Sequence, residues 1–195
     1  MAENVNGLKL LDNAVIFLSG IIDTEKAERI CKEVISLNIE QKHPFIQFII
    51  NSHGGYCSSG FAIIDIMEWS KLPIYTTGIG MVGSMGLMVF IAGEKGKRIL
   101  TPRTSILSHR YSGGHSGNHS QIVAARIEED FMHKRIITHY TQHSGLKTED
   151  ELNKHLLRDV DTWLTPEKAV SFGLADLIET DKKNPVPKFK KKTNG

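Results

Sequence analysis

The stretch at residues 80–90, Gly-Met-Val-Gly-Ser-Met-Gly-Leu-Met-Val-Phe, limits the possible folds of this chain more than any other segment. The glycines in its first half allow close approach of the backbone and unusual backbone angles. An apolar run that suits a buried helix follows directly. Ser84 therefore lies where a helix begins, at the positive end of the helix dipole and beside N–H groups without partners. A serine at this position can cap the helix, or it can act as a nucleophile beside groups that stabilise an oxyanion.

The pattern of a strand, a glycine-rich loop and a helix also occurs just upstream. An apolar run at 45–50 predicts a strand buried on both faces, followed by a loop at 51–55 and a helix at 57–69. Because the strands of a parallel sheet end at the same edge, the two loops are expected to meet. The backbone amides of Gly55 and Met85 can then donate to one shared oxyanion.

Strands and helices alternate along the rest of the chain, which indicates an α/β domain with a largely parallel sheet. A length of 195 residues fits one such domain. Further strands are expected at 14–18, 74–77, 97–100, 104–108 and 175–178, and further helices at 24–38, 85–92, 119–143, 148–157 and from Thr165-Pro166 onward. The helix at 24–38 is expected to bury Ala27, Ile30, Val34 and Ile35.

His109 follows the predicted strand at 104–108 and reaches the same sheet edge as Ser84, so the two side chains can form a nucleophile and its base. A histidine base needs an acid that holds the correct tautomer. The candidate acids downstream are Asp159, Asp161 and Asp176. The order of serine, histidine and acid differs from that of the α/β-hydrolases, which also have a glycine where this chain has Val82, so their fold is not expected.

Composition and charge argue against several classes of function. The net charge is +2, and residues 181–195 contain six Lys and one Asp, so we expect a solvated, disordered tail and no nucleic-acid partner. No apolar run is long enough to span a membrane, and residues 1–13 lack the apolar core of a signal peptide. Cys31 and Cys57 have neither disulfide nor metal spacing, and such free thiols indicate a reducing, cytoplasmic environment.

Two histidine pairs have the spacing of metal ligands on a helix, His115 with His119 and His139 with His143. Neither pair has the glutamate of an H-E-x-x-H motif, so we expect solvated or partly buried histidines and no metal site. The sequence gives no sign of a bound cofactor.

Six segments, taken in order, resemble the ClpP family, the proteolytic subunits of Clp proteases. The resemblance covers residues 8–179 and rests on INSHGG at 50–55, GMVGSMG at 80–86, AGEKGKR at 92–98, LSH at 107–109, DTWLT at 161–165 and AVSFGLAD at 169–176. Any one of these segments is a weak signal, whereas all of them in register are highly specific. The resemblance implies a crotonase-like fold of repeated strand–strand–helix units, with a projecting handle made of a strand and a long helix.

The resemblance also implies a serine endopeptidase that degrades unfolded polypeptides inside an oligomeric chamber. The implied site residues are Ser84 as nucleophile, His109 as general base, Asp161 as orienting acid, and Gly55 and Met85 as oxyanion-hole amides. The peptidase domain is expected at 1–180, with the handle at about 110–144. ClpP proteins form two stacked heptameric rings fed by a hexameric AAA+ ATPase, so ATP is used by the partner and no cofactor or metal is expected in this subunit.

The choice of acid follows from the family pattern. Asp159 and Asp161 are two residues apart, so in an extended segment both point to the same side and orientation does not decide between them. The family has an acid, then an aromatic residue, then Thr or Ser at alternate positions, which matches Asp161, Trp163 and Thr165. The Trp163 ring is expected to shield the Asp161 carboxylate from water. Asp159 is expected near the contact between rings, and Asp176 in a turn.

The chain departs from the family at four places. His53 replaces the usual Pro before the oxyanion-hole glycines, Arg110-Tyr111 replaces Gln-Pro after the histidine, and Val160 replaces the Arg before the acid. The segment before Ala14 is shorter than the one that forms the family's axial loops. We therefore expect that the loop accepts His53 in place of the proline, that the contact between rings is weaker, and that the pore admits peptides without an ATPase.

Two other functions remain open. A crotonase-type acyl-CoA enzyme shares the fold and the paired amides, but it stabilises an enolate and does not need a serine, a histidine and an acid together. A catalytically inactive structural ring subunit is the second alternative, although such relatives usually lack a member of the triad.

Overall fold

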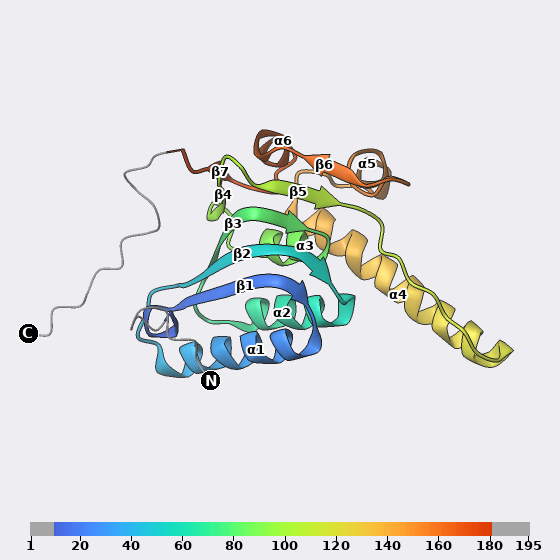
Figure 1. The fold of residues 1–195 in the computed structure, drawn as a ribbon, viewed down its shortest axis with the longest axis horizontal. Helices are drawn as coiled ribbons and strands as arrows, with labels where there is room; N and C mark the ends of the chain where they lie inside the picture. The colour runs from blue at the N-terminus through green and yellow to red at the C-terminus, as the bar shows by residue number, and fades with distance from the viewer. Residues whose placement is uncertain (1–9, 181–195) are drawn as a thin grey trace, which may run out of the picture.

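The computed structural model of the chain describes residues 10–180. The predictions for residues 1–9 and for the tail at 181–195 lie outside this part. The described residues form a mixed α/β fold in which helices pack against one sheet and one long helix projects from the body (Figure 1). Within this part of the chain, no helix is long and apolar enough to cross a bilayer.

In residues 10–180, seven strands form one sheet, and its parallel character confirms the predicted fold class. The strands are β1 (Val15–Ile22), β2 (Ile46–Gly55), β3 (Ile74–Gly83), β4 (Arg98–Leu100), β5 (Ser105–Ser108), β6 (Thr162–Leu164) and β7 (Leu177–Ile178). Their order is β1-β2-β3-β4-β7, and β5 pairs with the end of β3 and with β6. The pair β5–β6 is antiparallel, and the other paired strands run parallel.

The helices lie close to their predicted bounds. They are α1 (Thr24–Glu40), α2 (Cys57–Trp69), α3 (Met85–Ile91), α4 (His119–His143), α5 (Glu149–His155) and α6 (Pro166–Ser171), with a short 3-10 helix, η1 (Leu11–Asn13), before β1. The bounds of α2 and α4 match the predicted ones. Thr165 caps α6 by accepting the Lys168 N–H, and Pro166 takes the first helical position as predicted. Figure 1 shows α1 and α2 side by side along the sheet.

Three strands continue through residues that were predicted to be loops. β1 extends past Gly20, β2 includes the residues at 51–55, and β3 runs on to Gly83. The glycines stay in the strands because neighbouring backbones pair with them, and a shift of register in the β1–β2 and β2–β3 ladders absorbs the irregularity. The backbone around the predicted site is therefore held in the sheet.

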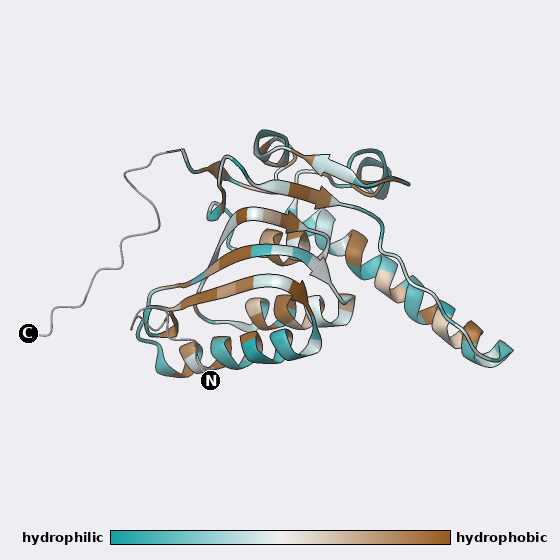
Figure 2. Cartoon of the chain, viewed as in Figure 1, coloured by the Kyte–Doolittle hydropathy of each residue, from teal (hydrophilic) through white to brown (hydrophobic). Residues whose placement is uncertain are grey.

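The inward face of α1 corrects one predicted core position. Ala27, Ile30 and Val34 are buried as predicted, whereas Ile35 is 38% exposed and Leu37 takes the next buried position. A helix turns by about 100° per residue, so Leu37 continues the stripe of three-residue and four-residue steps and Ile35 lies beside it. Figure 2 shows the result, with apolar strands in the centre and a hydrophilic outer face on α1.

The predicted handle at about 110–144 projects from the body, but its first part is not a strand. The segment at 110–118 is irregular and runs along α4 (Figure 1). The Tyr111 hydroxyl holds it there by donating to the Glu129 carbonyl at 3.1 Å. A strand needs a partner strand, and residues 10–180 offer none at this place. We call the segment 110–118 together with α4 the arm.

Most of the arm exposes apolar side chains to solvent. Burial in α4 is confined to its C-terminal end, at Ile136, His139 and Tyr140. The exposed apolar residues along the rest of α4 are Ile122, Val123, Ile127 and Phe131, and each is about half exposed. These apolar residues are therefore not core positions of the single chain, and Figure 2 shows brown patches along the projecting helix.

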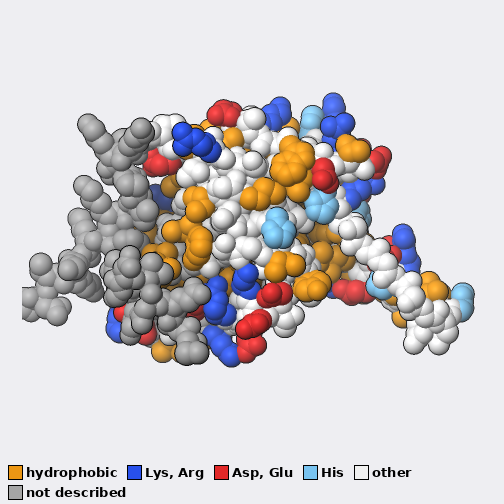
Figure 3. Space-filling model, in the orientation of Figure 1, with side chains coloured by type: hydrophobic (Ala, Val, Ile, Leu, Met, Phe, Trp, Pro, Cys, Tyr) orange, Lys and Arg blue, Asp and Glu red, His pale blue; other side chains and the backbone are white. Residues whose placement is uncertain are grey.

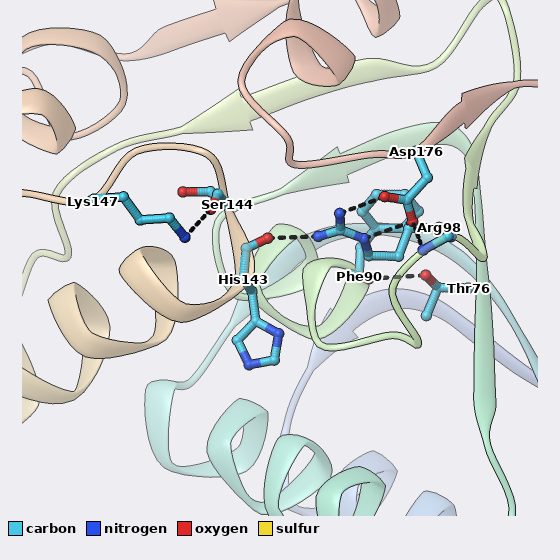
Figure 4. A network of polar contacts seen from close by, with 8 residues as sticks. Thr76, Phe90, Arg98, His143, Ser144, Lys147 and Asp176 are labelled. Atoms are coloured by element: carbon cyan, nitrogen blue, oxygen red, sulfur yellow. Dashed lines mark hydrogen bonds and ion pairs between the residues drawn. The ribbon is translucent and has the colours of Figure 1, made fainter.

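Asp176 lies in the bend before β7, where a turn was predicted, and it is also the partner of a buried arginine. Arg98 donates to both carboxylate oxygens, through Nε at 2.9 Å and Nη2 at 2.6 Å, and its Nη1 donates to the His143 carbonyl at 2.6 Å (Figure 4). The backbone N–H groups of Arg98 and Gly96 donate to the same carboxylate. This network joins β4, the segment before β7 and the end of α4.

The pKa of Asp176 reflects two opposing effects. Burial alone raises the pKa of this carboxyl, but the hydrogen bonds from the Arg98 side chain and backbone and the Arg98 charge outweigh burial. The pKa of Asp176 in the folded chain therefore lies below its ordinary value. The ionised carboxylate is the state that the fold stabilises.

Replacing Asp176 by Asn leaves the Arg98 charge buried without its partner. We expect Asp176→Asn to lower the free energy of unfolding at neutral pH by about 3 kcal/mol. The folded-state pKa lies below the unfolded value of about 3.9, so the contribution of the pair is complete above that pH and is lost as the pH falls through the folded-state value. The difference between the two proteins in urea unfolding should therefore shrink at acidic pH.

Glu33→Gln is the matched control, because Glu33 forms an ion pair with Arg29 at 2.6 Å on the surface of α1. Surface pairs contribute little to stability, so this variant should unfold like the wild type. Similar midpoints for Asp176→Asn and Glu33→Gln would contradict the role of Asp176 as a buried anchor.

Candidate active site

Ser84 occupies the N-cap position of α3, directly after β3, in a backbone conformation that few residues other than glycine adopt. Its φ is 53° and its ψ is −126°. Its N–H donates to the Leu107 carbonyl at 2.9 Å, and its carbonyl accepts from Leu87 and Met88 in the first turn of α3. The side chain makes no capping hydrogen bond, so the hydroxyl is not engaged with the helix that it precedes.

The conformation of Ser84 creates a sharp turn from strand to helix. A positive φ at a residue with a side chain costs on the order of 1–3 kcal/mol, and it persists only where the surroundings impose it. The nucleophile of α/β-hydrolases lies on a strained turn of this kind, which exposes its hydroxyl. The hydrolase motif is absent here because position 82 is Val, yet a comparable turn forms.

The space for this turn comes from Gly54, on the neighbouring strand β2. A Cβ on Gly54 would lie 2.7 Å from the Ser84 Cβ and 2.9 Å from the Met85 amide nitrogen. Gly54 also has a φ of +101°, which a side chain disfavours. The end of β2 therefore touches the start of α3, and only a glycine permits that contact.

The two residues predicted to form the oxyanion hole lie at this contact. Met85 is the first residue of α3, where the N–H has no acceptor within the helix. Gly55 is the last residue of β2, and a Cβ there would lie 2.2 Å from the Ile22 carbonyl oxygen. The structure brings the chain at Gly54-Gly55 against the chain at Ser84-Met85, while the role of the two amides as oxyanion donors stays a prediction.

Two polar residues of β2 hold this arrangement, and both were predicted to be loop residues. The Ser52 hydroxyl donates to the Gly20 carbonyl at 2.6 Å and accepts the Gly54 N–H at 3.0 Å. The Asn51 side chain accepts the Met81 N–H at 3.1 Å. Polar side chains that continue a run of buried strand residues are the sequence signal that could have identified them.

The register of three neighbouring strands places Ser84, His109 and Asp161 close to one another. Gly83 at the end of β3 is opposite Leu107 in β5, and Ser108 at the end of β5 is opposite Thr162 at the start of β6. Ser84 and His109 each follow the last residue of a strand, and Asp161 precedes the first residue of the antiparallel β6. All three residues therefore lie at the same end of adjacent strands.

His109 is half-buried, and its Nδ1 lies 2.5 Å from the Arg110 carbonyl oxygen. A carbonyl only accepts, so Nδ1 carries the proton and Nε2 holds the free lone pair. A general base of this type uses the same tautomer. Among residues 10–180, no hydrogen bond joins the side chains of Ser84, His109 and Asp161 in the single chain.

His109 shares a hollow with both aspartates of the following segment. Arg110 forms an ion pair with Asp159 at 3.4 Å, and its Nε donates to the Leu157 carbonyl at 2.7 Å. Arg110 thus ties the segment before β6 to the end of β5. Asp161 and Trp163 are both exposed, so the predicted shielding of the Asp161 carboxylate by the Trp163 ring is wrong for the single chain.

The strand end beneath His109 is anchored to the base of the arm. The Ser108 hydroxyl lies 3.2 Å from the hydroxyl of Tyr140, a fully buried residue of α4. Burial raises the pKa of Tyr140 to about 12, although the hydrogen bond with Ser108 acts in the opposite direction. His53, the residue that replaces the family's Pro, is exposed.

Comparison with known proteins identifies the family of the chain. The family model described as Clp protease matches residues 3–182. The ATP-dependent Clp protease proteolytic subunit 2 of Thermobifida fusca (strain YX) is 34% identical over 173 residues, which are 89% of this chain and 84% of the relative. The protein of the same name from Corynebacterium glutamicum is 34% identical over 179 residues, which are 91% and 87% of the two chains. This chain therefore belongs to the Clp protease family, and it is a Clp-type peptidase.

Proposed function

We propose that the chain is a serine endopeptidase that cleaves unfolded polypeptides, with Ser84 as nucleophile, His109 as general base and Asp161 as the acid that orients the base. The strained turn at Ser84 carries this proposal. It leaves the hydroxyl unengaged beside the free N–H groups of α3, and a protein retains such strain mainly where function needs it.

The chemistry follows from the positions of these groups. The Ser84 hydroxyl attacks the carbonyl carbon of the peptide bond, and His109 Nε2 accepts its proton. The N–H groups of Gly55 and Met85 stabilise the oxyanion that forms. His109 then protonates the leaving amine. In the second half of the reaction, His109 accepts a proton from a water molecule that attacks the acyl-enzyme, and it returns a proton to the Ser84 oxygen as the acid product leaves.

Asp161 can orient His109 only if the imidazole exchanges its present partner. His109 Nδ1 faces the Arg110 carbonyl in the single chain, whereas Asp159 is already paired with Arg110. Asp161 forms no ion pair among residues 10–180, so its carboxylate is free to accept from Nδ1. This difference supports Asp161 over Asp159 as the acid.

We also propose that the chain works as a homo-oligomer of two stacked heptameric rings in the cytoplasm, supplied with unfolded substrates by an AAA+ ATPase that uses the ATP. The exposed apolar residues of α4 support an assembly, because a projecting helix with apolar side chains needs a partner (Figure 3). The names of the two relatives describe proteolytic subunits of ATP-dependent proteases.

Neither alternative function has a specific observation in its favour. An inactive ring subunit does not need a strained serine next to a histidine at the end of the neighbouring strand. An acyl-CoA enzyme does not need these two residues together with an acid.

Ser84→Ala should abolish the hydrolysis of a short fluorogenic peptide and leave the oligomer mass unchanged in native mass spectrometry. Removing the hydroxyl removes the nucleophile, while alanine preserves the packing at the start of α3. A fluorophosphonate should label Ser84 in the wild type and give no adduct in the variant. Ser58→Ala is the matched control, since Ser58 is an exposed serine near the start of α2. Wild-type turnover by Ser84→Ala would refute the proposal.

Gly54→Ala should lower kcat/KM by at least ~10², the effect of removing one oxyanion-hole donor. The new Cβ would displace Ser84 and the Met85 amide, both of which lie within 3 Å of it. Circular dichroism and oligomer mass establish whether the variant folds. Gly113→Ala is the control, because a Cβ there meets no atom within 4 Å. A folded Gly54→Ala variant with full activity would contradict the proposed geometry.

Asp161→Asn should lower kcat by at least ~10² with the oligomer intact, because the amide favours the wrong tautomer of His109. Asp159→Asn should retain activity and shift the distribution of oligomers, because it loses only its pairing with Arg110. The measurements are peptide hydrolysis and native mass spectrometry on both variants. The reverse pattern, with Asp159→Asn inactive and Asp161→Asn active, would show that the acid is Asp159.

A further inference from the structure

A cluster of possible metal ligands lies where α2, α3 and α4 meet. Glu68 comes from α2, and His139 and His143 come from α4, with one donor atom of each within 4.8 Å of the others. The sequence predicted no metal at this histidine pair because no glutamate stands between the two histidines. The fold supplies the carboxylate from another helix, which a search for a local motif cannot find.

His139 is buried and held by the end of α3. Its Nε2 lies 2.9 Å from the Met88 carbonyl oxygen, and because a carbonyl only accepts, Nε2 carries the proton and Nδ1 holds a lone pair. Burial, together with the neighbouring His143, lowers the pKa of His139 to about 4. The ring is therefore neutral at physiological pH, which is the form that binds metal.

His143 is placed in a similar way, one helical turn along. Burial lowers its pKa, with the charges of Arg98 and Lys147 acting in the same direction, while Glu68 and a hydrogen bond to the Ile91 carbonyl oppose the shift. Its Nε2 lies 3.8 Å from Glu68 Oε1, which is too long for a hydrogen bond. Figure 4 shows its ring pointing away from the Arg98 guanidinium.

The His139 imidazole thus has a backbone carbonyl of α3 as its hydrogen-bond partner, and the Ile91 carbonyl of the same helix acts on the His143 ring. Histidines that bind metals usually donate their second N–H to a carbonyl or a carboxylate, which fixes the orientation of the ring. Two cationic side chains lie near this cluster, and each is engaged with other groups, so its charge repels a bound metal ion less than a free cation would. Arg98 is paired with Asp176, and the Lys147 ammonium group donates to the carbonyls of Thr141 and Ser144.

We propose that Glu68, His139 and His143 bind one divalent transition-metal ion per subunit, with Zn²⁺ as the best match and a water molecule at the fourth position. Two imidazoles and one carboxylate form a known three-ligand set for zinc. Tetrahedral ligands at zinc distances are about 3.4 Å apart, so the His143–Glu68 pair at 3.8 Å must close by about 0.4 Å. The two donor pairs that include His139 lie within 4.8 Å and must close by at most about 1.4 Å. Glu68 is exposed and can make this adjustment.

Such an ion would act as a clamp at the base of the arm. It would join α4 directly to α2, and through the two histidines it would fix the end of α3, the helix that begins at Ser84. The expected role is structural, because the ligands lie at the opposite end of α3 from Ser84. Hydrolysis of short peptides should therefore continue without the metal.

The test uses the full-length oligomer, stripped with a chelator and dialysed, and then titrated with ZnCl₂ by calorimetry, with elemental analysis of the bound metal. We expect about one zinc per subunit and a higher unfolding temperature in the presence of zinc. Glu68→Gln and His143→Gln should each weaken binding at least ~10-fold and remove the thermal shift. Both positions lie outside the proposed catalytic groups, so both variants should retain peptidase activity.

Two controls separate this site from adventitious binding. His115→Gln/His119→Gln removes the other histidine pair with the same spacing, in which His115 Nε2 lies 3.3 Å from Glu129 Oε1, and this variant should bind zinc like the wild type. Co²⁺ should give a visible band without thiolate charge transfer, which excludes Cys31 and Cys57 as ligands. Failure of the wild type to bind, unchanged binding by Glu68→Gln and His143→Gln, or loss of binding in the control variant would each overturn the proposal.

Discussion

The contact between Gly54 and Ser84 is the constraint on which the candidate site depends. The two backbones approach so closely that a Cβ on Gly54 would overlap the Ser84 side chain and the Met85 amide. This approach fixes where β2 ends relative to the start of α3, and it allows Ser84 to keep a positive φ. The hydrogen bonds of Ser52 hold the Gly54 peptide in place, so the strain at Ser84 is balanced by an ordered strand end and not by a loose loop.

The base of the arm connects this site to the surface where subunits are proposed to meet. Tyr140 contacts Ser108 beneath His109, His139 contacts the end of α3, and the His143 carbonyl accepts from Arg98. These three contacts come from the last turns of α4, where His139 and Tyr140 are buried and His143 is partly buried. A movement of the arm would therefore act on both α3, which begins after Ser84, and β5, which ends before His109, and this gives the proposed assembly a physical route to influence the candidate site.

Local patterns predicted the elements well where one physical effect dominates. The sequence predicted the bounds of α2 and α4, and the Thr165-Pro166 pair predicted the start of α6. The glycine-rich ends of β2 and β3 were misjudged, because glycine and polar residues usually mark loops, and here pairing with neighbouring strands overrides that preference. The strand predicted for the first part of the arm does not form, because the segment at 110–118 has no partner strand within the described chain.

The sequence by itself determined the family and the fold class, together with the identity of the candidate residues Ser84, His109 and Asp161, because these depend on motifs that are short and ordered along the chain. Only the tertiary structure decided which groups lie together, because distances between elements depend on packing and not on spacing in the sequence. In the tertiary structure Asp176 pairs with Arg98, the Ser84 hydroxyl makes no capping hydrogen bond, and Glu68 lies near two histidines of another helix. The Arg98–Asp176 pair and the approach of Glu68 to the two histidines join residues that are far apart in the chain, where no local pattern can record them.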